Sequence, residues 1–245
     1  MVNSLELPNK LPHNLIENKF TCWAAIRRYT IETDLGCLTV VRQDCENLRE
    51  TVAVEPDVVL FERLVQRLDE PRLRMLTIIT ATESNGVYAT KAKERGIKFV
   101  GDGGKIMVAT LTQMGDCTPE MNLASVDPKF TTSMEEDNLV CSVKVILGDR
   151  AVSSGSVMVN DGIATFDGIF TEMDFQRRGL ATIVMGYLVR WALNKAASTG
   201  VLNASPQGQL LYCKLGWTAV YNIVSLGGQP ALDFHARMRE KYARK

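Results

Sequence analysis

The stretch from residue 163 to residue 193 constrains this chain more than any other part of it. It begins with a run of β-branched and aromatic residues, 163–171, which predicts a strand. A short turn with the sequence Gln-Arg-Arg-Gly-Leu-Ala, residues 176–181, follows. Apolar residues then recur at steps of three and four and predict a helix with one apolar face: Leu180, Ile183, Val184, Tyr187, Leu188 and Trp191.

A strand that enters a helix through such a turn favours an anion-binding site. The first backbone N–H groups of a helix have no partner within the helix, and the helix dipole adds positive charge at the same end. Gly179 removes the side chain that would block an incoming phosphate, and Arg177 and Arg178 add positive charge. Taken alone, the turn is equally compatible with an ordinary strand–helix connection whose arginines are solvated.

The residues after this helix repeat the alternation of strand and helix. Residues 201–205 predict a short strand, and residues 206–215 predict a helix with Pro206 in its first turn, where a missing N–H costs nothing. Gly216 suits the position after a helix end, and residues 217–226 predict a further strand.

Two segments in this order resemble the GNAT N-acetyltransferase superfamily. Residues 176–181 resemble the family's Q/R-x-x-G-x-G/A turn, and residues 211–217, Leu-Tyr-Cys-Lys-Leu-Gly-Trp, resemble its L-Y-x-x-x-G-F segment. The resemblance covers residues 138–226. It implies an α/β (α+β) fold with a mixed, mostly antiparallel sheet flanked by helices, in which two central strands part to admit a thioester.

The resemblance also implies an enzyme that transfers an acetyl group from acetyl-CoA, as cosubstrate, to a primary amine. Backbone groups near Ile169 and Thr171 would pair with the pantetheine arm, and the amides of residues 177–181 would hold the pyrophosphate. The implied cosubstrate-binding residues are Ile169, Phe170, Thr171, Gln176, Arg177, Arg178, Gly179, Leu180, Ala181, Thr182 and Asn203.

Three residues, Met173, Asn203 and Ser205, leave details of this implied site open. Met173 stands where the family commonly has a proline, which leaves the rigidity of the loop undetermined, whereas Gln176 lies within the family's pattern. Asn203 and Ser205 end a predicted strand. They contact the acceptor or the pantetheine in one interpretation, and in the other they only cap the helix that begins at Pro206.

Tyr212 is the candidate general acid, because the resemblance places it near the departing sulfur and a phenol can protonate a thiolate. The alternative is a core tyrosine on an amphipathic helix. For the general base, Asp167 and Glu172 flank the active strand, while Glu135 and Glu136 lie in the preceding loop. Glu172 is taken as the second catalytic candidate, although the amine could also arrive without a protein base.

The first half of the chain echoes the second without the basic turn. Residues 75–81 predict a strand and residues 83–95 a helix that contains Tyr88, followed by a glycine and an aromatic residue. We therefore expect a tandem of a degenerate GNAT-like domain, residues 1–112, and a GNAT N-acetyltransferase domain, residues 113–245. Coincidence is the alternative, because strand–helix–strand order is common in α/β chains.

Elsewhere the local patterns predict a loose lead-in, a helix, two early hairpins and a long connecting loop before three antiparallel strands. An Asn-Asp-Gly turn at residues 160–162 is the strongest of the hairpin signals. The expected segments are the lead-in 1–19, the strand pairs 22–31 with 35–42 and 97–100 with 105–111, the helix 57–68, the loop 113–137, and the strands 138–147, 151–160 and 163–171.

Composition narrows the classes of function. The 28 basic and 28 acidic residues give a net charge of zero, which argues against a nucleic-acid-binding surface. The sequence contains no run of about 18 apolar residues, so it predicts no membrane span. Its first residues do not resemble a secretory signal. Six scattered cysteines without a C-x-x-C pair and only two histidines predict reduced thiols, a cytoplasmic protein and no metal.

The expected partners are acetyl-CoA and a small amine, amino acid or peptide; a homodimer stays open. The competing class is a catalytically silent acyl-CoA-binding or protein-interaction module. The intact turn and Tyr212 favour the enzyme, because a silent module has no physical need for both.

Overall fold

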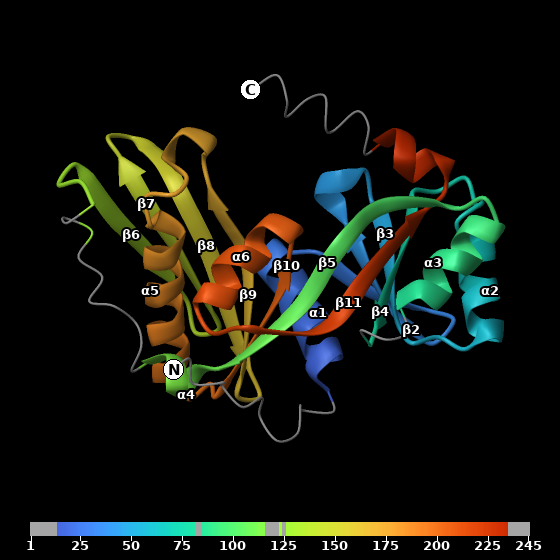
Figure 1. Cartoon of the computed structure of the whole chain (residues 1–245), viewed down its shortest axis with the longest axis horizontal. Coiled ribbons are helices and arrows are strands. Elements are labelled where there is room, and N and C mark those ends of the chain that lie inside the picture. The colour runs from blue at the N-terminus through green and yellow to red at the C-terminus, as the bar shows by residue number, and fades with distance from the viewer. Residues whose placement is uncertain (1–13, 82–84, 116–122, 124–125, 235–245) are drawn as a thin grey trace. The chain divides into compact units, whose positions relative to one another are not determined.

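The computed structural model describes residues 14–81, 85–115, 123 and 126–234 of the chain. Contacts divide the chain into two compact units (Figure 1). Unit 1 comprises Met1–Arg27 and Met107–Thr218, and unit 2 comprises Arg28–Ile106 and Ala219–Lys245.

Unit 1 is a sheet with helices on its faces, in the strand order β5-β10-β9-β8-β7-β6. Strands β6 to β9 are antiparallel neighbours, and β10 runs parallel to β9. Its elements are α1 (Leu15–Arg27), the last residues of β5 (Lys98–Thr110), α4 (Leu111–Gly115), β6 (Phe130–Glu136), β7 (Val140–Leu147), β8 (Arg150–Asn160), β9 (Ile163–Thr171), the 3₁₀ turn η4 (Met173–Phe175), α5 (Leu180–Asn194), β10 (Thr199–Ala204) and α6 (Pro206–Lys214).

The hairpin and helix expected around residue 163 form for the predicted reasons. Asp161 and Gly162 both have positive φ, 49° and 72°, as a tight two-residue hairpin turn between twisted strands requires. Helix α5 buries its apolar face, including Val184 and Leu188, against β7, β8 and β9. This packing fixes the start of α5 relative to the end of β9.

Unit 2 contains the strands that follow one another in the order β1-β2-β3-β4-β11-β5. Strand β3 is antiparallel to β2 and parallel to β4, and β11 is antiparallel to β4. Its elements are β1 (Thr30–Asp34), β2 (Cys37–Arg42), the 3₁₀ turn η1 (Gln43–Cys45), β3 (Leu48–Val54), α2 (Val58–Arg67), β4 (Arg74–Thr80), α3 (Asn85–Glu94), most of β5 and β11 (Thr218–Gly227).

The two units follow the same order of elements. In unit 1, three antiparallel strands β7, β8 and β9 lead through α5 to the parallel strand β10, then through α6 to β11. In unit 2, β1, β2 and β3 lead through α2 to the parallel strand β4, then through α3 to β5. The final strand of each series joins the other series' sheet, since β5 is the neighbour of β10 and β11 is the neighbour of β4.

The division into units differs from the expected one at residue 112 for a physical reason. Helix α1 packs on β8 and β9 and therefore belongs to unit 1. Strand β11 pairs with β4 and therefore belongs to unit 2 from Ala219 onwards.

Three local predictions are wrong. Residues 22–27 form the second half of α1 rather than a strand, because the ambiguous apolar run around Ala24 packs as a helix face. The strand begins only at Thr30 and runs to Asp34. Helix α1 also takes up the end of the predicted lead-in, whose residues 1–13 lie outside the described chain. The two strands predicted at 97–100 and 105–111 are one strand, β5 (Lys98–Thr110), within which Gly103 takes a φ of 70°.

The third error concerns the predicted loop 113–137. Its last part is the strand β6, which pairs along its whole length with β7 and therefore satisfies its backbone hydrogen bonds on one side. Residues 116–122 and 124–125 of the loop lie outside the described residues.

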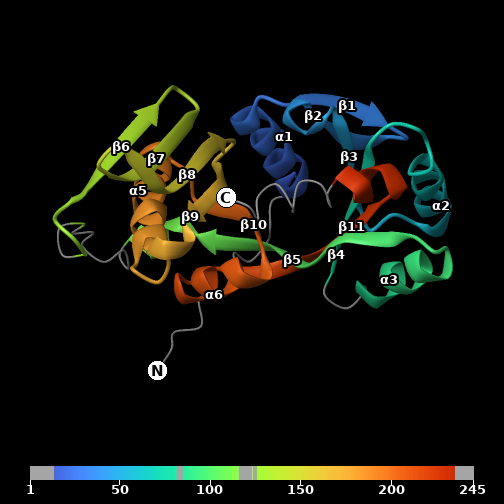
Figure 2. The same ribbon diagram turned by 90° about the horizontal axis from the view of Figure 1, so that it is seen from above.

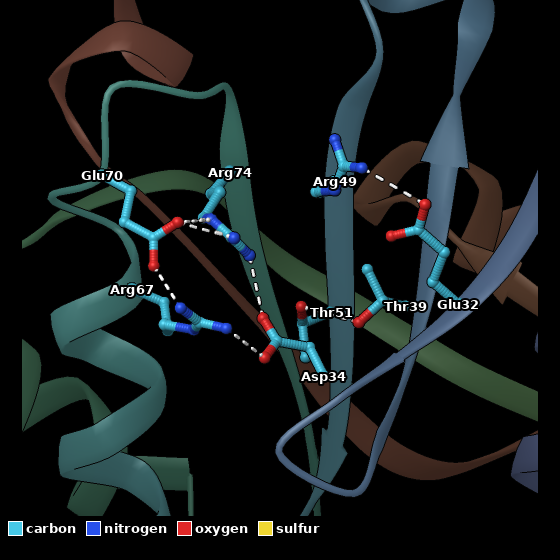
Figure 3. A network of polar contacts seen from close by, with 8 residues as sticks. All are labelled: Glu32, Asp34, Thr39, Arg49, Thr51, Arg67, Glu70 and Arg74. Atoms are coloured by element: carbon cyan, nitrogen blue, oxygen red, sulfur yellow. Dashed lines mark hydrogen bonds and ion pairs between the residues drawn. The ribbon is translucent and has the colours of Figure 1, made fainter.

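A ring of four alternating charges joins β1, α2 and β4 in unit 2 (Figure 3). Asp34 accepts from Arg67 at 2.8 Å and from Arg74 at 2.9 Å, and Glu70 binds the same two guanidiniums at 2.5 and 2.7 Å. The side chains of Arg74 and Asp34 are only 8% and 13% exposed, so each charge depends on its partners.

We expect Asp34→Asn to lower the free energy of unfolding by about 1–3 kcal/mol at pH 7, since it leaves buried guanidinium donors poorly paired. Burial raises the pKa of Asp34, but Arg67 and Arg74 outweigh it and hold that pKa below its ordinary value. The stabilisation is therefore complete above the unfolded-state pKa of about 4 and is lost as the pH falls through the folded-state pKa.

Urea unfolding of parent and variant at pH 7 and at lower pH checks this expectation. Glu32→Gln is the control, because Glu32 pairs with Arg49 near the same strands but is 49% exposed. A difference between parent and Asp34→Asn that grows as the pH falls would contradict the assignment.

Candidate functional site

The site begins where β9 and β10 part. The two strands pair in parallel from Ile163 with Thr199 to Phe166 with Leu202, and the pairing ends there although β9 continues to Thr171. Beyond that point a cavity of about 700 Å³ opens between the end of β9, the following turn, the start of α5 and α6. Past the last paired residues, β10 no longer pairs with β9. The backbone groups on that edge of β9 are therefore available to a bound molecule.

Most of the predicted cosubstrate-binding residues come together around this cavity. Arg178 and Asn203 do not line it, whereas Ser205 and Tyr212 do. The predicted residues that line the cavity are Ile169, Phe170, Thr171, Gln176, Arg177, Gly179, Leu180, Ala181 and Thr182.

A bulge in β9 turns the end of the strand toward the cavity. The register with β8 shifts between Ser154 and Ser156, and Gly168 opposite has a φ of 64°. Gly155 makes room for the re-aimed strand, because a Cβ there would lie 2.4 Å from Cδ1 of Ile169. The sequence contained these glycines, but nothing in its pattern identified the bulge.

The turn before α5 presents unpaired N–H groups. Gly179 is the N-cap residue, with a φ of 82°, and it provides no side-chain cap. The first intrahelical bond is donated by Ile183 to the carbonyl of Gly179, so the N–H groups of Leu180, Ala181 and Thr182 have no partner within the helix. By contrast, Asp57 caps α2 and Ser205 caps α6 through their side chains.

Side-chain contacts hold the loop between β9 and α5. Gln176 donates to the carbonyl of Thr171 at 3.1 Å and accepts from Gln207 of α6 at 3.3 Å. Arg178 donates to the carbonyl of Asp174 and lies over the ring of Phe175, 5.3 Å from its centroid. Arg178 therefore braces the loop, while Arg177 lines the cavity.

Tyr212 is both buried and part of the cavity wall. It is 6% exposed and packs beside Trp217 with ring centroids 6.1 Å apart. Burial, and secondarily the charge of Asp167, raises the pKa of Tyr212 to about 12. Within the described part of the chain its hydroxyl makes no hydrogen bond, so the proton is not committed to a protein acceptor.

The four predicted carboxylates separate in the structure, and none lines the cavity. Glu172 binds Arg150 through both oxygens, at 3.0 and 2.6 Å, and Glu135 pairs with Lys144. Glu136 accepts from the indole of Trp191.

Asp167 differs from the other carboxylates in its position. It directly follows Phe166, the last paired residue of β9, and its Oδ2 accepts from Nε of Arg27 at 2.5 Å. Sequence reasoning missed Arg27, because the segment that contains it had been predicted as a strand far from the site.

The remaining residues carry other roles. Asn203 is exposed and lies outside the cavity lining, and Ser205 accepts from the N–H of Gly208 as the cap of α6.

Across the described ranges, no three His, Cys, Asp or Glu side chains gather as a metal site. None of the helices described has the length and apolar character needed to cross a bilayer.

We expect Gly155→Ala to destabilise the protein by about 1–3 kcal/mol, because the new methyl group would overpack Ile169, Val184 and Leu188. The matched control is Gly86→Ala on the exposed start of α3, where a Cβ meets no atom within 4 Å. That change should be neutral or stabilising by up to about 1 kcal/mol. Chemical unfolding distinguishes them; equal effects of both changes would contradict the close approach.

Comparison with known proteins gives the fold but no close relative. No protein-family model matches the sequence, and no curated protein does. Solved structures do match. A GCN5-related N-acetyltransferase from Kribbella flavida is 14% identical, with a TM-score of 0.59 over 87% of this chain and 94% of that one.

Two further structures agree. A conserved protein of unknown function from Staphylococcus epidermidis is 11% identical, with a TM-score of 0.56 over 82% of this chain and 94% of its own. A GCN5-related N-acetyltransferase from Sphaerobacter thermophilus is 13% identical, with a TM-score of 0.52 over 90% and 96%. The chain therefore has the GNAT fold, as the two sequence segments predicted.

Proposed function

We propose that the chain is an N-acetyltransferase that transfers the acetyl group of acetyl-CoA to a primary amine, with its chemistry in unit 1. One observation carries the proposal: the gap between β9 and β10 opens into a cavity that contains both an uncapped helix start and a buried tyrosine. The first suits a pyrophosphate and the second suits a proton donor.

The residues of the turn fit the phosphates of acetyl-CoA. Leu180, Ala181 and Thr182, whose N–H groups have no partner within the helix, line the cavity at the N-terminus of α5, where the helix dipole is positive. A Cβ on Gly179 would meet no protein atom within 4 Å, so the space beside it is open to a ligand. Arg177 and Lys214 line the same cavity and add positive charge.

The end of β9 fits the pantetheine arm. Past Phe166 this strand has lost β10 as a neighbour, so its N–H and C=O groups on that side need other partners. An amide-containing chain laid along Ile169 to Thr171 would supply them in the manner of an added strand. Binding along this edge would hold the thioester close to Tyr212.

Acetyl-CoA would supply the acetyl group as an activated thioester. A bond forms between the acceptor nitrogen and the carbonyl carbon, and the carbon–sulfur bond breaks. Tyr212 donates its phenolic proton to the departing sulfur and regains one from solvent, while the acceptor nitrogen loses its proton to solvent. A phenol with a pKa of about 12 is fully protonated at neutral pH and so is present as the acid.

We further propose that unit 2 is a GNAT-like copy that does not bind acetyl-CoA. Its parallel strands stay joined beyond the end of β3, because Glu55 donates its N–H to Ile79 and accepts from the N–H of Ala81, both at 2.9 Å. Asp57 caps the helix start that would face a phosphate, and the phenol of Tyr88 donates to the carbonyl of Pro56.

Calorimetric titration with acetyl-CoA tests the binding part of the proposal. We expect one site per chain in the parent and no measurable binding by Gly179→Glu, which places a carboxylate beside the unpaired N–H groups. Arg177→Ala should weaken binding by about tenfold, the loss of one charge-assisted contact, without straining the turn. Arg190→Ala, on the exposed side of α5, is the control. Absence of binding by the parent would overturn the assignment.

Tyr212→Phe tests the chemistry. With the best acceptor from a panel of amines, turnover measured by release of the CoA thiol should fall by about 10²-fold or more, since a general acid contributes that much. The dissociation constant of acetyl-CoA should change little, because the phenyl ring keeps its packing against Trp217. An equal loss of acetyl-CoA affinity and of turnover in Tyr212→Phe would contradict the role of Tyr212 as general acid.

A further inference from the structure

Helices α1 and α6 lie on opposite sides of β9 and β10 (Figure 2). On the α6 side, Phe166 packs against Trp217, which in turn contacts Tyr212. Side chains alternate along a strand, so Asp167 projects to the other side, where Nε of Arg27 donates to its Oδ2 at 2.5 Å. Arg27 is the last residue of α1, and Asp167 is the first residue of β9 after its pairing with β10 ends. The end of α1 is therefore tied to β9 at the place where the two strands part.

The bulge in β9 begins at this contact. Asp167 pairs with Ser156 of β8. The next pair joins Phe170 to Ser154, so β9 has one more residue than β8 between these two pairs. Since successive residues of a strand turn their backbone groups to opposite edges, one extra residue shifts this alternation by one position. The bulge therefore sets which N–H and C=O groups the end of β9 turns to its free edge.

Arg27 also lies beside the second residue of the bulge. Gly168 has a φ of 64°, in the left-handed region that glycine adopts at little cost. A Cβ on Gly168 would lie 3.2 Å from Nη2 of Arg27, which is closer than such atoms normally approach. One guanidinium thus meets two successive residues of β9, by an ion pair with Asp167 and by close approach to Gly168.

Helix α1 gives Arg27 a fixed base. The helix packs on β8, β9 and β10, and its side chains Leu15 and Phe20 are buried. The side-chain amide of Asn18 donates to the carbonyl of Asn160, at the end of β8, at 3.2 Å. The bulge is therefore held from a helix that is itself anchored on the same sheet.

We propose that Arg27 is a positioning residue for the acetyl donor: it holds Asp167 and Gly168 and so fixes the bulge that directs the edge of β9. This inference rests on the proposed function, in which the pantetheine arm of acetyl-CoA lies along Ile169 to Thr171. Arg27 does not line the cavity and acts through β9. It supports groups that meet the donor, as an outer contact supports a binding site.

The exposure of the pair favours this role over a purely stabilising one. The side chains of Arg27 and Asp167 are 43% and 20% exposed, and ion pairs so exposed contribute little to the free energy of unfolding. The same contact can still select one conformation of a strand end that has lost its neighbour on one side. Its removal should therefore change donor binding more than it changes stability.

Calorimetric titration with acetyl-CoA tests the inference on Arg27→Met, which removes the charge and the donors but keeps a long side chain. The dissociation constant should rise about three- to tenfold, within the range of coupling between residues in contact. With the best amine, kcat should stay within about twofold of the parent value, because support of donor binding alone raises KM. Arg27→Lys should recover part of the affinity, since an ammonium group keeps the ion pair but lacks the fork beside Gly168.

A double-mutant cycle separates this ion pair from the other contacts of Arg27. Asp167→Asn should weaken acetyl-CoA binding by a similar factor, and the double variant should bind no more weakly than the weaker-binding single variant. Asn18→Ala is the matched control, because it removes a hydrogen bond between the same helix and β8 but leaves the contact at the bulge in place. Its dissociation constant should stay within about twofold of the parent value.

Hydrogen–deuterium exchange gives a readout that needs no cosubstrate. In Arg27→Met, residues 166–172 should exchange faster than in the parent, because the end of β9 is no longer held. Helix α5, which packs on the sheet through its own apolar face, should keep its protection.

The outcomes separate the two proposals. A parent that does not bind acetyl-CoA refutes the proposed function and the inference with it. A parent that binds, with unchanged affinity in Arg27→Met, keeps the function and overturns the inference, whatever the exchange rates show. An equal loss of affinity in Asn18→Ala also overturns it, as does a double variant whose loss is the product of the two single losses.

Discussion

The parting of β9 from β10 after Phe166 and Leu202 is the constraint on which the site depends. A parallel pair that stayed joined would bury its backbone groups in the ladder and leave nothing for a ligand to bind. The bulge at Gly168 and the core packing of α5 hold the strand end away from its neighbour. The backbone groups on this edge of β9 therefore have no partner in β10 beyond Phe166, and the proposed binding of the cosubstrate depends on them.

Unit 2 has the same order of elements, but there the ends of the two parallel strands stay joined. There the carboxylate of Glu55 links the ends of β3 and β4, and Asp57 occupies the first N–H groups of α2. Unit 1 has an eight-residue connection, 172–179, before α5, whereas unit 2 has only residues 55–57 before α2. The shorter connection places Asp57 directly at the helix start, where its side chain accepts from the N–H of Leu60.

Charged groups lie on both faces of the gap between β9 and β10. On the α6 face the helix start, Arg177 and Lys214 form a cationic end of the cavity. On the α1 face Arg27 and Asp167 form a neutral pair. The other carboxylates that the sequence offered as bases do not line the cavity and are bound to Arg150, Lys144 or Trp191. Tyr212, on α6, is buried in the wall of the same cavity, and burial raises its pKa to about 12.

The sequence by itself determined the elements whose signals are local. The strand 163–171, the glycine-bearing turn, the apolar face of α5 and the capped helix with Tyr212 all depend on neighbours within a few residues, so pattern and resemblance predicted most of the cavity lining. Only the tertiary structure decided that α1 is a helix on β9, that β5 is one strand, and that Arg27 meets Asp167. Those outcomes depend on partners up to 140 positions away, whose packing overrides local propensity.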